Sequence, residues 1–449
     1  MPSPMEVTII SRETIKPSSP TPHHLRAFKL SLLDQLVPCC YTQVLLFYLI
    51  DGFHGQSIET SHISTRLKDS LSETLTHFYP LAGSIGDDEL QIDCNDEGVP
   101  YFEARVDCNL SEFLQEPELE LLNQFFPCDP LNTPPMAKLH LAMIQVNIFN
   151  RGGIAIGVCL SHKIADGVSI SAFLKAWAAI ARGCFEEYPS FEAKSLFPQN
   201  ESLPQDYSMV LGKCLIRTGK CVTKRVVFDA SAIAALKAKA SVDCTRVEVV
   251  SAFIWKRAMA AAKQKLGFQR SSILTHAVNL RKKTIPSLPE SSIGNLFWIA
   301  ITEGRVDDEA ELDLLVDKTR KAISKISCDF AKKLQGEEGF AVAFEHVKEV
   351  KAAFEEDGVD FYGFSSWCKF EVYEGDFGWG RPIWVSSFSG KGSVYKNLIF
   401  FMDTRCGNGI EAWVTLDEEE LGILECDPEF LSFGSMDPSP LKLAHFGQV

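Results

Sequence analysis

One stretch decides the fold of this chain: His162-Lys163-Ile164-Ala165-Asp166-Gly167. It follows an apolar run at 154–160, which predicts a buried strand. It precedes 168–182, where apolar residues recur at helical spacing up to Gly183. A histidine on such a strand-to-helix turn can present one ring nitrogen to a substrate, and imidazole titrates near neutral pH. The stretch therefore predicts either a general base or, more simply, a turn histidine followed by a helix N-cap, Asp166.

A second stretch, Asp376-Phe377-Gly378-Trp379-Gly380, is followed by Arg381-Pro382. Two glycines and a proline around a tryptophan make a regular strand unfavourable and indicate a rigid, tightly turned backbone. Taken alone, the stretch is equally consistent with a structural loop in which Trp379 fills a gap in the core.

Together, and in this order, the two stretches resemble the signatures of the plant BAHD acyltransferase family, a His-x-x-x-Asp-Gly turn and an Asp-Phe-Gly-Trp-Gly loop. Further stretches resemble other landmarks of the family, so that the resemblance spans roughly residues 7 to 416: Leu30 to Gln35, Tyr79 to Gly83, Thr245 to Glu248, Asn279 to Arg281, and Gly294-Asn295. Within the family the chain is most similar to the vinorine synthase type, whose members mostly acetylate hydroxyl groups of alkaloids and terpenoids.

The resemblance implies a mixed α/β fold of two chloramphenicol-acetyltransferase-like domains with a solvent channel between them. The length of 449 residues also exceeds what a single core usually supports. The stretch at 186–207 is polar and contains three prolines, so it is the best candidate for a linker between two domains. We therefore expect an N-terminal domain at 1–185, a crossover linker at 186–210 and a C-terminal domain at 211–449. Long helices are predicted at 63–78, 247–266, 309–335 and 342–355.

The chemistry that the resemblance implies is acyl-CoA-dependent O-acylation. His162 removes the proton of an acceptor hydroxyl, which attacks the thioester directly. No Gly-x-Ser-x-Gly motif argues for a covalent route. Asp166 is implied to pair with Arg281 and to act as a structural partner of the turn. The loop that contains Asp376 is implied to lie away from the histidine, as an architectural element.

The candidate site residues follow from these roles. The catalytic candidates are His162 and Asp376. Structural support is assigned to Asp166, Arg281, Gly167, Gly378 and Trp379. Candidate donors to the oxyanion are Asn295 and Trp379. Candidate contacts to coenzyme A are Ser251, Asn279, Lys282 and Ser386. No metal ligands are expected, and the co-substrate is acetyl-CoA.

The formal charge of −15 disfavours nucleic acid and anionic membranes as partners, since both require basic surfaces. The phosphates of coenzyme A still need local positive charge, which we expect at 281–283 and 220–225. The apolar stretches are too short to span a bilayer, and residues 1–15 do not resemble a signal peptide. The 14 cysteines form no compact framework. We expect a cytoplasmic monomer whose partners are a small alcohol and a coenzyme A thioester.

Four alternatives stay open at this point. A condensation domain that joins carrier-bound substrates has a similar turn, but usually with a second histidine where this chain has Ser161. A metal site could use His162 and Asp166 four residues apart, although no further ligand cluster accompanies them. The acyl donor could be benzoyl-, malonyl- or hydroxycinnamoyl-CoA. Lastly, the protein could be a non-catalytic relative that binds a small molecule.

Overall fold

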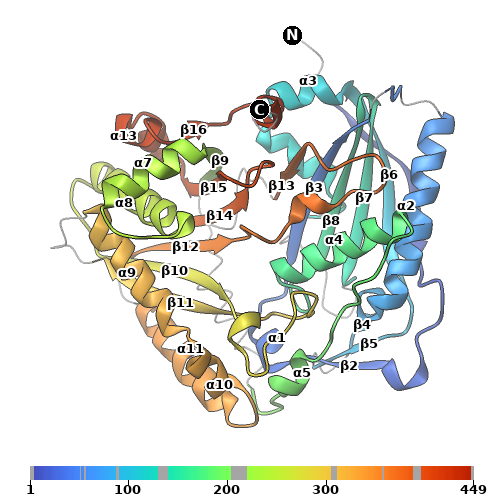
Figure 1. Cartoon of the computed structure of the whole chain (residues 1–449), viewed down its shortest axis with the longest axis horizontal. Coiled ribbons are helices and arrows are strands. Elements are labelled where there is room, and N and C mark those ends of the chain that lie inside the picture. Colours follow the sequence, from blue (N-terminus) through green and yellow to red (C-terminus); the bar gives the residue numbers. More distant parts are fainter. Residues whose placement is uncertain are drawn as a thin grey trace.

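The computed structural model describes residues 5–50, 52–54, 57–86, 90–129, 140–203, 220–304, 311–355, 358–387 and 396–445. Two large mixed sheets lie side by side, with helices packed against their outer faces (Figure 1). Within the described residues, the sheet of the first half has the strand order β1-β6-β7-β8-β3-β13. Its strands are β1 (Val7–Ile15), β6 (Val99–Asn109), β7 (Ala142–Arg151), β8 (Gly153–Ser161), β3 (Tyr41–Leu49) and β13 (Trp384–Ser386).

The sheet of the second half has the order β11-β10-β12-β14-β15-β9-β16 in the same described residues. Its strands are β11 (Phe297–Gly304), β10 (Ser272–Asn279), β12 (Asp360–Ser366), β14 (Leu398–Asp403), β15 (Ile410–Asp417), β9 (Cys221–Phe228) and β16 (Ser435–Met436). Strands β10, β12 and β14 run parallel, and the remaining pairs are antiparallel. A small third sheet contains β2 (Ala27–Lys29), β5 (Gln91–Asp93) and β4 (Ser84–Ile85).

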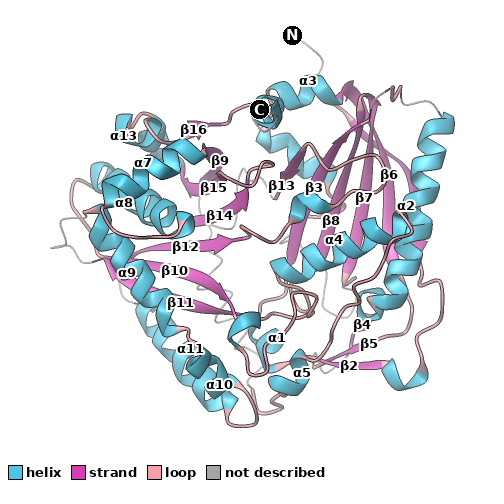
Figure 2. Cartoon of the chain, viewed as in Figure 1, coloured by secondary structure: helices cyan, strands magenta, loops and turns pink. Residues whose placement is uncertain are grey.

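The helices separate into two groups, seen in cyan in Figure 2. Those of the first half are α1 (Leu32–Leu36), α2 (Ser57–His77), α3 (Leu110–Gln115), α4 (Gly167–Ala181) and α5 (Ala193–Leu196). Those of the second half are α7 (Ala230–Ala240), α8 (Arg246–Leu266), α9 (Leu312–Lys325), α10 (Cys328–Leu334), α11 (Gly339–Glu355), α12 (Glu418–Glu425), α13 (Pro428–Leu431) and α14 (Pro440–His445). No helix in the described part of the chain is both long and apolar enough to cross a membrane.

The predicted long helices are confirmed except for the one at 309–335, which is wrong. Residues 309 and 310 lie outside the described residues, and the rest forms two helices, α9 and α10. The break has a local cause, because the Ser327 side chain accepts a hydrogen bond from the backbone N–H of Phe330 and caps a new helix. Serine at this point favours a helix start over continuation.

Strand β8 places the histidine turn between the two sheets. It pairs with β3 on one side and β7 on the other, and all of its residues are buried. The run at 154–160 is therefore a buried strand, as predicted. Gly153 is required at its start, because a Cβ there would lie 1.9 Å from the backbone oxygen of Tyr48. The chain leaves the sheet at Ser161 and enters α4 at Gly167.

The two halves exchange segments. Strand β13 belongs to the second half by sequence, yet it pairs with β3 in the first sheet (Figure 1). In the opposite direction, helix α1 buries Leu32, Leu33 and Leu36 in a core cluster with Leu280 and Leu296 of the second half. Residues 204–210 of the expected linker lie outside the described residues, and the domain boundaries stay a prediction. The exchange brings α1 and the turn after β10 to the histidine.

Candidate active site

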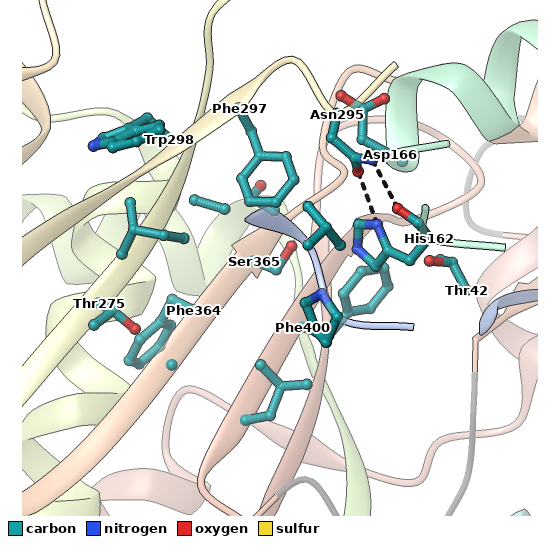
Figure 3. A pocket seen from close by; sticks show the side chains of 18 of the residues that line it. Thr42, His162, Asp166, Thr275, Asn295, Phe297, Trp298, Phe364, Ser365 and Phe400 are labelled. Carbon is teal, nitrogen blue, oxygen red and sulfur yellow. Dashed lines mark hydrogen bonds between the residues drawn. The ribbon is translucent and has the colours of Figure 1, made fainter. Parts of the chain in front are cut away.

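A cavity of about 330 Å³ lies between the two sheets and is lined from both halves of the chain. The first half contributes β3, the end of α1 and the turn after β8. The second half contributes residues of β10, β11, β12 and β14 and of helix α11. His162 stands on the wall of this cavity, near Phe297, at a ring-centroid distance of 6.0 Å (Figure 3). The lining is mostly apolar, and the volume is typical of a site for a small organic molecule.

The His162 ring is held by Asn295. Its Nδ1 lies 2.9 Å from Oδ1 of Asn295, and Nδ2 of Asn295 donates to the backbone oxygen of His162 at 2.7 Å (Figure 3). The same Nδ2 donates to Oδ1 of Asp34 at 2.9 Å. Two oxygen acceptors around Nδ2 fix the orientation of the amide, so that its oxygen must face the imidazole.

This orientation determines the tautomer of His162. Because the amide oxygen can only accept a hydrogen bond, Nδ1 of the neutral imidazole must carry the proton. Nε2 is then unprotonated and has a lone pair available. Burial lowers the pKa of the His162 imidazole below its usual value, although the negative charge of Asp166 acts in the opposite direction. The neutral, basic form is therefore favoured at neutral pH.

Asp34 is the anchor of this hydrogen-bonded chain. Its Oδ1 accepts from the backbone N–H and the side chain of Asn295, and its Oδ2 accepts from the backbone N–H and hydroxyl of Ser31. Burial raises the pKa of the Asp34 carboxyl, while these four hydrogen bonds act against the rise. The Ser31 and Asp34 pair also forms the capping box of α1. Lys163 fixes the same helix by donating to backbone oxygens of Asp34, Gln35 and Val37.

Sequence reasoning did not assign a role to Asp34. The signal available in the sequence was Ser31-x-x-Asp34, a capping-box pattern, which predicts a helix start and not a contact with residue 295. The role of the buried Asp34 carboxyl becomes evident only from its hydrogen bonds to Asn295, in the other half of the chain.

The predicted ion pair between Asp166 and Arg281 is confirmed. Nη1 and Nη2 of Arg281 donate to the two carboxylate oxygens of Asp166 at 2.7 and 2.9 Å. Both side chains are buried. Asp166 also accepts from the backbone N–H groups of Ser169, as the N-cap of α4, and Leu296. The imidazole Nδ1 is occupied by Asn295, so Asp166 joins the two halves and does not form a dyad with His162.

Gly167 is required by close packing. A Cβ at this position would lie 2.4 Å from Cε2 and Nε1 of Trp367. The indole of Trp367 is buried, and it belongs to the stretch between β12 and the glycine loop. The glycine of the histidine turn therefore allows the second half to pack directly against the first turn of α4.

The glycine loop lies on the first half, outside the lining of the cavity. Oδ1 of Asp376 accepts hydrogen bonds from the backbone N–H groups of Gly378 and Gly380 at 2.7 and 2.9 Å. These two glycines have φ of +106° and +98°, a region that favours glycine. Phe377 is fully buried against Trp177, at a centroid distance of 4.9 Å. Asp376 thus holds the loop together and is not among the described residues that line the cavity, and its catalytic role stays a prediction.

The geometry does not favour either candidate donor to the oxyanion. The side-chain N–H groups of Asn295 are used by Asp34 and by the backbone of His162. Trp379 lies in the glycine loop, beside Phe377 and Tyr48, and is not among the described residues that line the cavity. Its buried Nε1 has no hydrogen-bond partner in the described part of the chain. We assign Asn295 to positioning the imidazole.

The four candidate contacts to coenzyme A are not brought together. Asn279 lines the cavity, and its Oδ1 accepts from the backbone N–H of Arg281. Ser251 is fully buried inside α8, and Ser386 is fully buried with its hydroxyl on the backbone oxygen of Ser387. Lys282 is exposed and pairs with a glutamate beside a second, smaller cavity. Only Asn279 of the four therefore lines the main cavity.

In the two segments expected to bind the phosphates of coenzyme A, 281–283 and 220–225, several basic side chains form ion pairs with carboxylates of the protein. Arg281 is buried with Asp166, and Arg225 is buried with Glu411 because strand alternation turns it inward. Lys224 pairs with carboxylates on the surface. Among the described residues, no group of three or more histidine, cysteine, aspartate or glutamate side chains is placed to hold a metal ion.

Comparison with known proteins gives the same picture. The model of the Transferase family matches residues 5–431. The chain is 44% identical to the epi-neemfruitin B 7-O-acetyltransferase of Melia azedarach and 44% identical to the limonoid 7-O-acetyltransferase of Citrus sinensis. Each alignment covers 97% of this chain and 100% of the relative. The crystal structure of vinorine synthase is similar with a TM-score of 0.81 and 35% identity, over 95% of this chain and 98% of that one. The predicted fold class is confirmed.

Proposed function

The chain belongs to the plant BAHD acyltransferase family, and we propose that it transfers an acetyl group from acetyl-CoA to a hydroxyl group of a terpenoid or alkaloid. The observation that carries the proposal is the imidazole of His162, which is fixed by Asn295 with a basic Nε2 on the wall of a mostly apolar cavity. A general base needs this combination of a fixed position, a lone pair and access to the substrate.

The reaction follows from the tautomer of His162. Nε2 takes the proton of the acceptor hydroxyl as its oxygen forms a bond to the thioester carbonyl carbon. The tetrahedral intermediate collapses when the carbon–sulfur bond breaks, and the thiolate of coenzyme A receives the proton from the imidazolium. The hydrogen bond from Nδ1 to Asn295 holds the ring through both proton transfers. No covalent acyl-enzyme is required.

The proposed acceptor class rests on the relatives and on the cavity. One relative at 44% identity is named a limonoid 7-O-acetyltransferase, and another is named an epi-neemfruitin B 7-O-acetyltransferase; limonoids are terpenoids. The surface of the cavity wall is mostly apolar and includes several phenylalanines, which suits a rigid, mostly apolar ring system: Phe297, Phe361, Phe364, Phe370 and Phe400. Acetyl-CoA is the proposed donor because the same relatives are named as acetyltransferases.

The test is acetyl transfer to a panel of limonoid and alkaloid alcohols, followed by mass spectrometry of the product and by release of free coenzyme A thiol. Acetyl-, malonyl- and benzoyl-CoA are compared as donors. His162→Ala should lower turnover about 10²- to 10⁴-fold, the usual contribution of a general base. The matched control is His24→Ala, which removes an exposed histidine near the N-terminus, far from His162 in the sequence. Near wild-type turnover in a folded His162→Ala variant would refute the mechanism.

A further inference from the structure

Gly363 is a glycine in the interior of a strand, where glycine is unfavourable. It lies in the middle of β12, between β10 and β14, and its backbone N–H donates to the backbone oxygen of Asn397. Glycine in a strand interior weakens the strand and usually indicates a bulge, a tight bend, or the close approach of a backbone or ligand. We therefore ask whether a bulge, a bend, a neighbouring backbone or a ligand accounts for the glycine at position 363.

In the described structure neither a bulge nor a close backbone contact explains this glycine. The register of β12 is regular on both sides, with Gly363 opposite Thr275 on β10 and Leu398 on β14, so there is no bulge. The φ of Gly363 lies outside the left-handed region. A Cβ would meet Cδ1 of Leu398 at 3.5 Å and Oγ1 of Thr275 at 3.6 Å, which are ordinary contacts. Nothing in the described fold requires the absence of a side chain.

The missing side chain leaves space in the cavity. Gly363 is half-buried and lines the cavity together with Thr275 and Leu398. We call the space over these three residues the Gly363 notch. Phe361 and Ile299 of the same cavity lining are bulkier, whereas Ala277 and Ser365 are small. The notch is thus part of a recess in the face of the second sheet, bordered by larger side chains.

The notch lies at a distance from the reacting groups that suits the far end of a large acceptor. Thr275 precedes Asn279 by four residues on β10, which corresponds to roughly 13 Å along the strand. Asn279 is opposite Phe297, the neighbour of His162. Figure 3 shows Thr275 across the cavity from His162. A rigid molecule of several fused rings can span this length while it presents a hydroxyl to Nε2.

We propose that the Gly363 notch is a specificity-determining subsite that seats the distal rings of a polycyclic acceptor. The inference rests on the proposed function and names the part of the cavity that selects acceptor size. Acetyl-CoA is the competing occupant of the notch, because Thr275 offers a hydroxyl there and Lys396, two residues before Leu398, is a cation among the described lining residues. The KM for acetyl-CoA distinguishes the two occupants.

The experiment fills the notch. Gly363→Ala and Gly363→Val are compared with Gly422→Ala, a matched control in α12 whose added Cβ would meet nothing within 4 Å in the described chain. The probes are a limonoid with a free secondary hydroxyl and menthol, a monocyclic alcohol. We expect kcat/KM for the limonoid to fall about 10- to 200-fold, the range for one misfitted methylene group in an apolar pocket. We expect kcat/KM for menthol and KM for acetyl-CoA to stay unchanged.

A second variant tests the notch in the other direction and does not depend on the folding of the Gly363 variants. Leu398 is half-buried, so Leu398→Ala should enlarge the notch with little loss of stability. The preference for the limonoid over menthol should then persist or rise. Binding of both alcohols is also measured by calorimetry without acetyl-CoA, so that the result holds even if acetyl transfer itself is not observed. Equal losses for both alcohols, a rise in KM for acetyl-CoA alone, or equal binding by wild-type and Gly363→Val protein would overturn the proposal.

Discussion

The carboxylate of Asp34 and the side-chain amide of Asn295 are joined by a 2.9 Å hydrogen bond between the two halves of the chain. Through this bond a residue of α1 determines the orientation of the amide that holds His162. The basic nitrogen of the imidazole is thus selected by a carboxylate that does not contact the ring. Asp34 and Asn295 therefore act as positioning residues for the proposed general base.

The first prediction concerns this chain of hydrogen bonds. Asn295→Ala should lower kcat by at least tenfold, because the imidazole is then free to rotate and to change tautomer. In serine proteases a wrong histidine tautomer lowers kcat about 10⁴-fold, and we take this value as the largest loss expected for Asn295→Ala. KM for acetyl-CoA should change little. Steady-state kinetics of Asn295→Ala, with an unfolding curve as the control for folding, measures this. Unchanged kcat in a folded variant would show that the hydrogen bond does not position the base.

The second prediction is the pH dependence of turnover. Burial lowers the pKa of His162 below the ordinary value of 6.5, so the base form persists to lower pH than in free histidine. As the pH falls through this lowered pKa, the imidazole becomes protonated and the rate should decline. The acid limb of the kcat profile should therefore have its midpoint below 6.5. A midpoint above 6.5 would argue against His162 as the rate-limiting base.

The sequence was sufficient for the parts of the structure that local pattern determines. The apolar run before His162 predicted β8, and the spacing after Gly167 predicted α4. The predicted helix at 309–335 failed because a single serine, Ser327, starts a new helix within a pattern that continues through it. The pairing of Asp166 with Arg281 came from the resemblance to a family and not from periodicity.

Other parts of the site could not be read from the sequence because they depend on contacts between distant residues. Asp34 is separated from Asn295 by 261 positions, and no local pattern indicates that the two meet. Ser251 and Ser386 are candidate contacts to coenzyme A, and only the packed structure shows that both are buried. No sequence pattern distinguishes Gly363 from the other glycines, and its position in the cavity lining is known only from the structure.

The third prediction concerns the glycine loop. Asp376→Ala removes the acceptor for the N–H groups of Gly378 and Gly380, and hydrogen bonds to a charged acceptor typically contribute about 1.5–3 kcal/mol each. The variant should have a lower Tm and a lower soluble yield, and its activity should fall with the folded fraction. Asp376→Asn, which keeps an acceptor oxygen, serves as the conservative control and should recover much of the stability. Abolished turnover with unchanged stability would instead assign a chemical role to the carboxylate.

The last prediction concerns the ion pair between Asp166 and Arg281. Both side chains are buried, so removal of one partner leaves the other charge without compensation, at a cost of about 3–5 kcal/mol. Asp166→Ala and Arg281→Ala should each lower the free energy of unfolding by this amount. Each should also reduce kcat, because Asp166 is the N-cap of α4 and ties the histidine turn to the second half of the chain.

The double variant Asp166→Ala/Arg281→Ala should cost clearly less than the sum of the two single variants, because neither charge is then left unpaired. Urea unfolding of the four proteins gives the coupling free energy. The neighbouring pair of Lys282 with Glu290 is the matched control, since its lysine is 80% exposed and surface pairs contribute little. Additive losses for Asp166 and Arg281, equal in size to those of the surface pair, would contradict the assignment. Strong coupling that is absent from the surface pair would identify the buried pair as the link that fixes the histidine turn between the two halves.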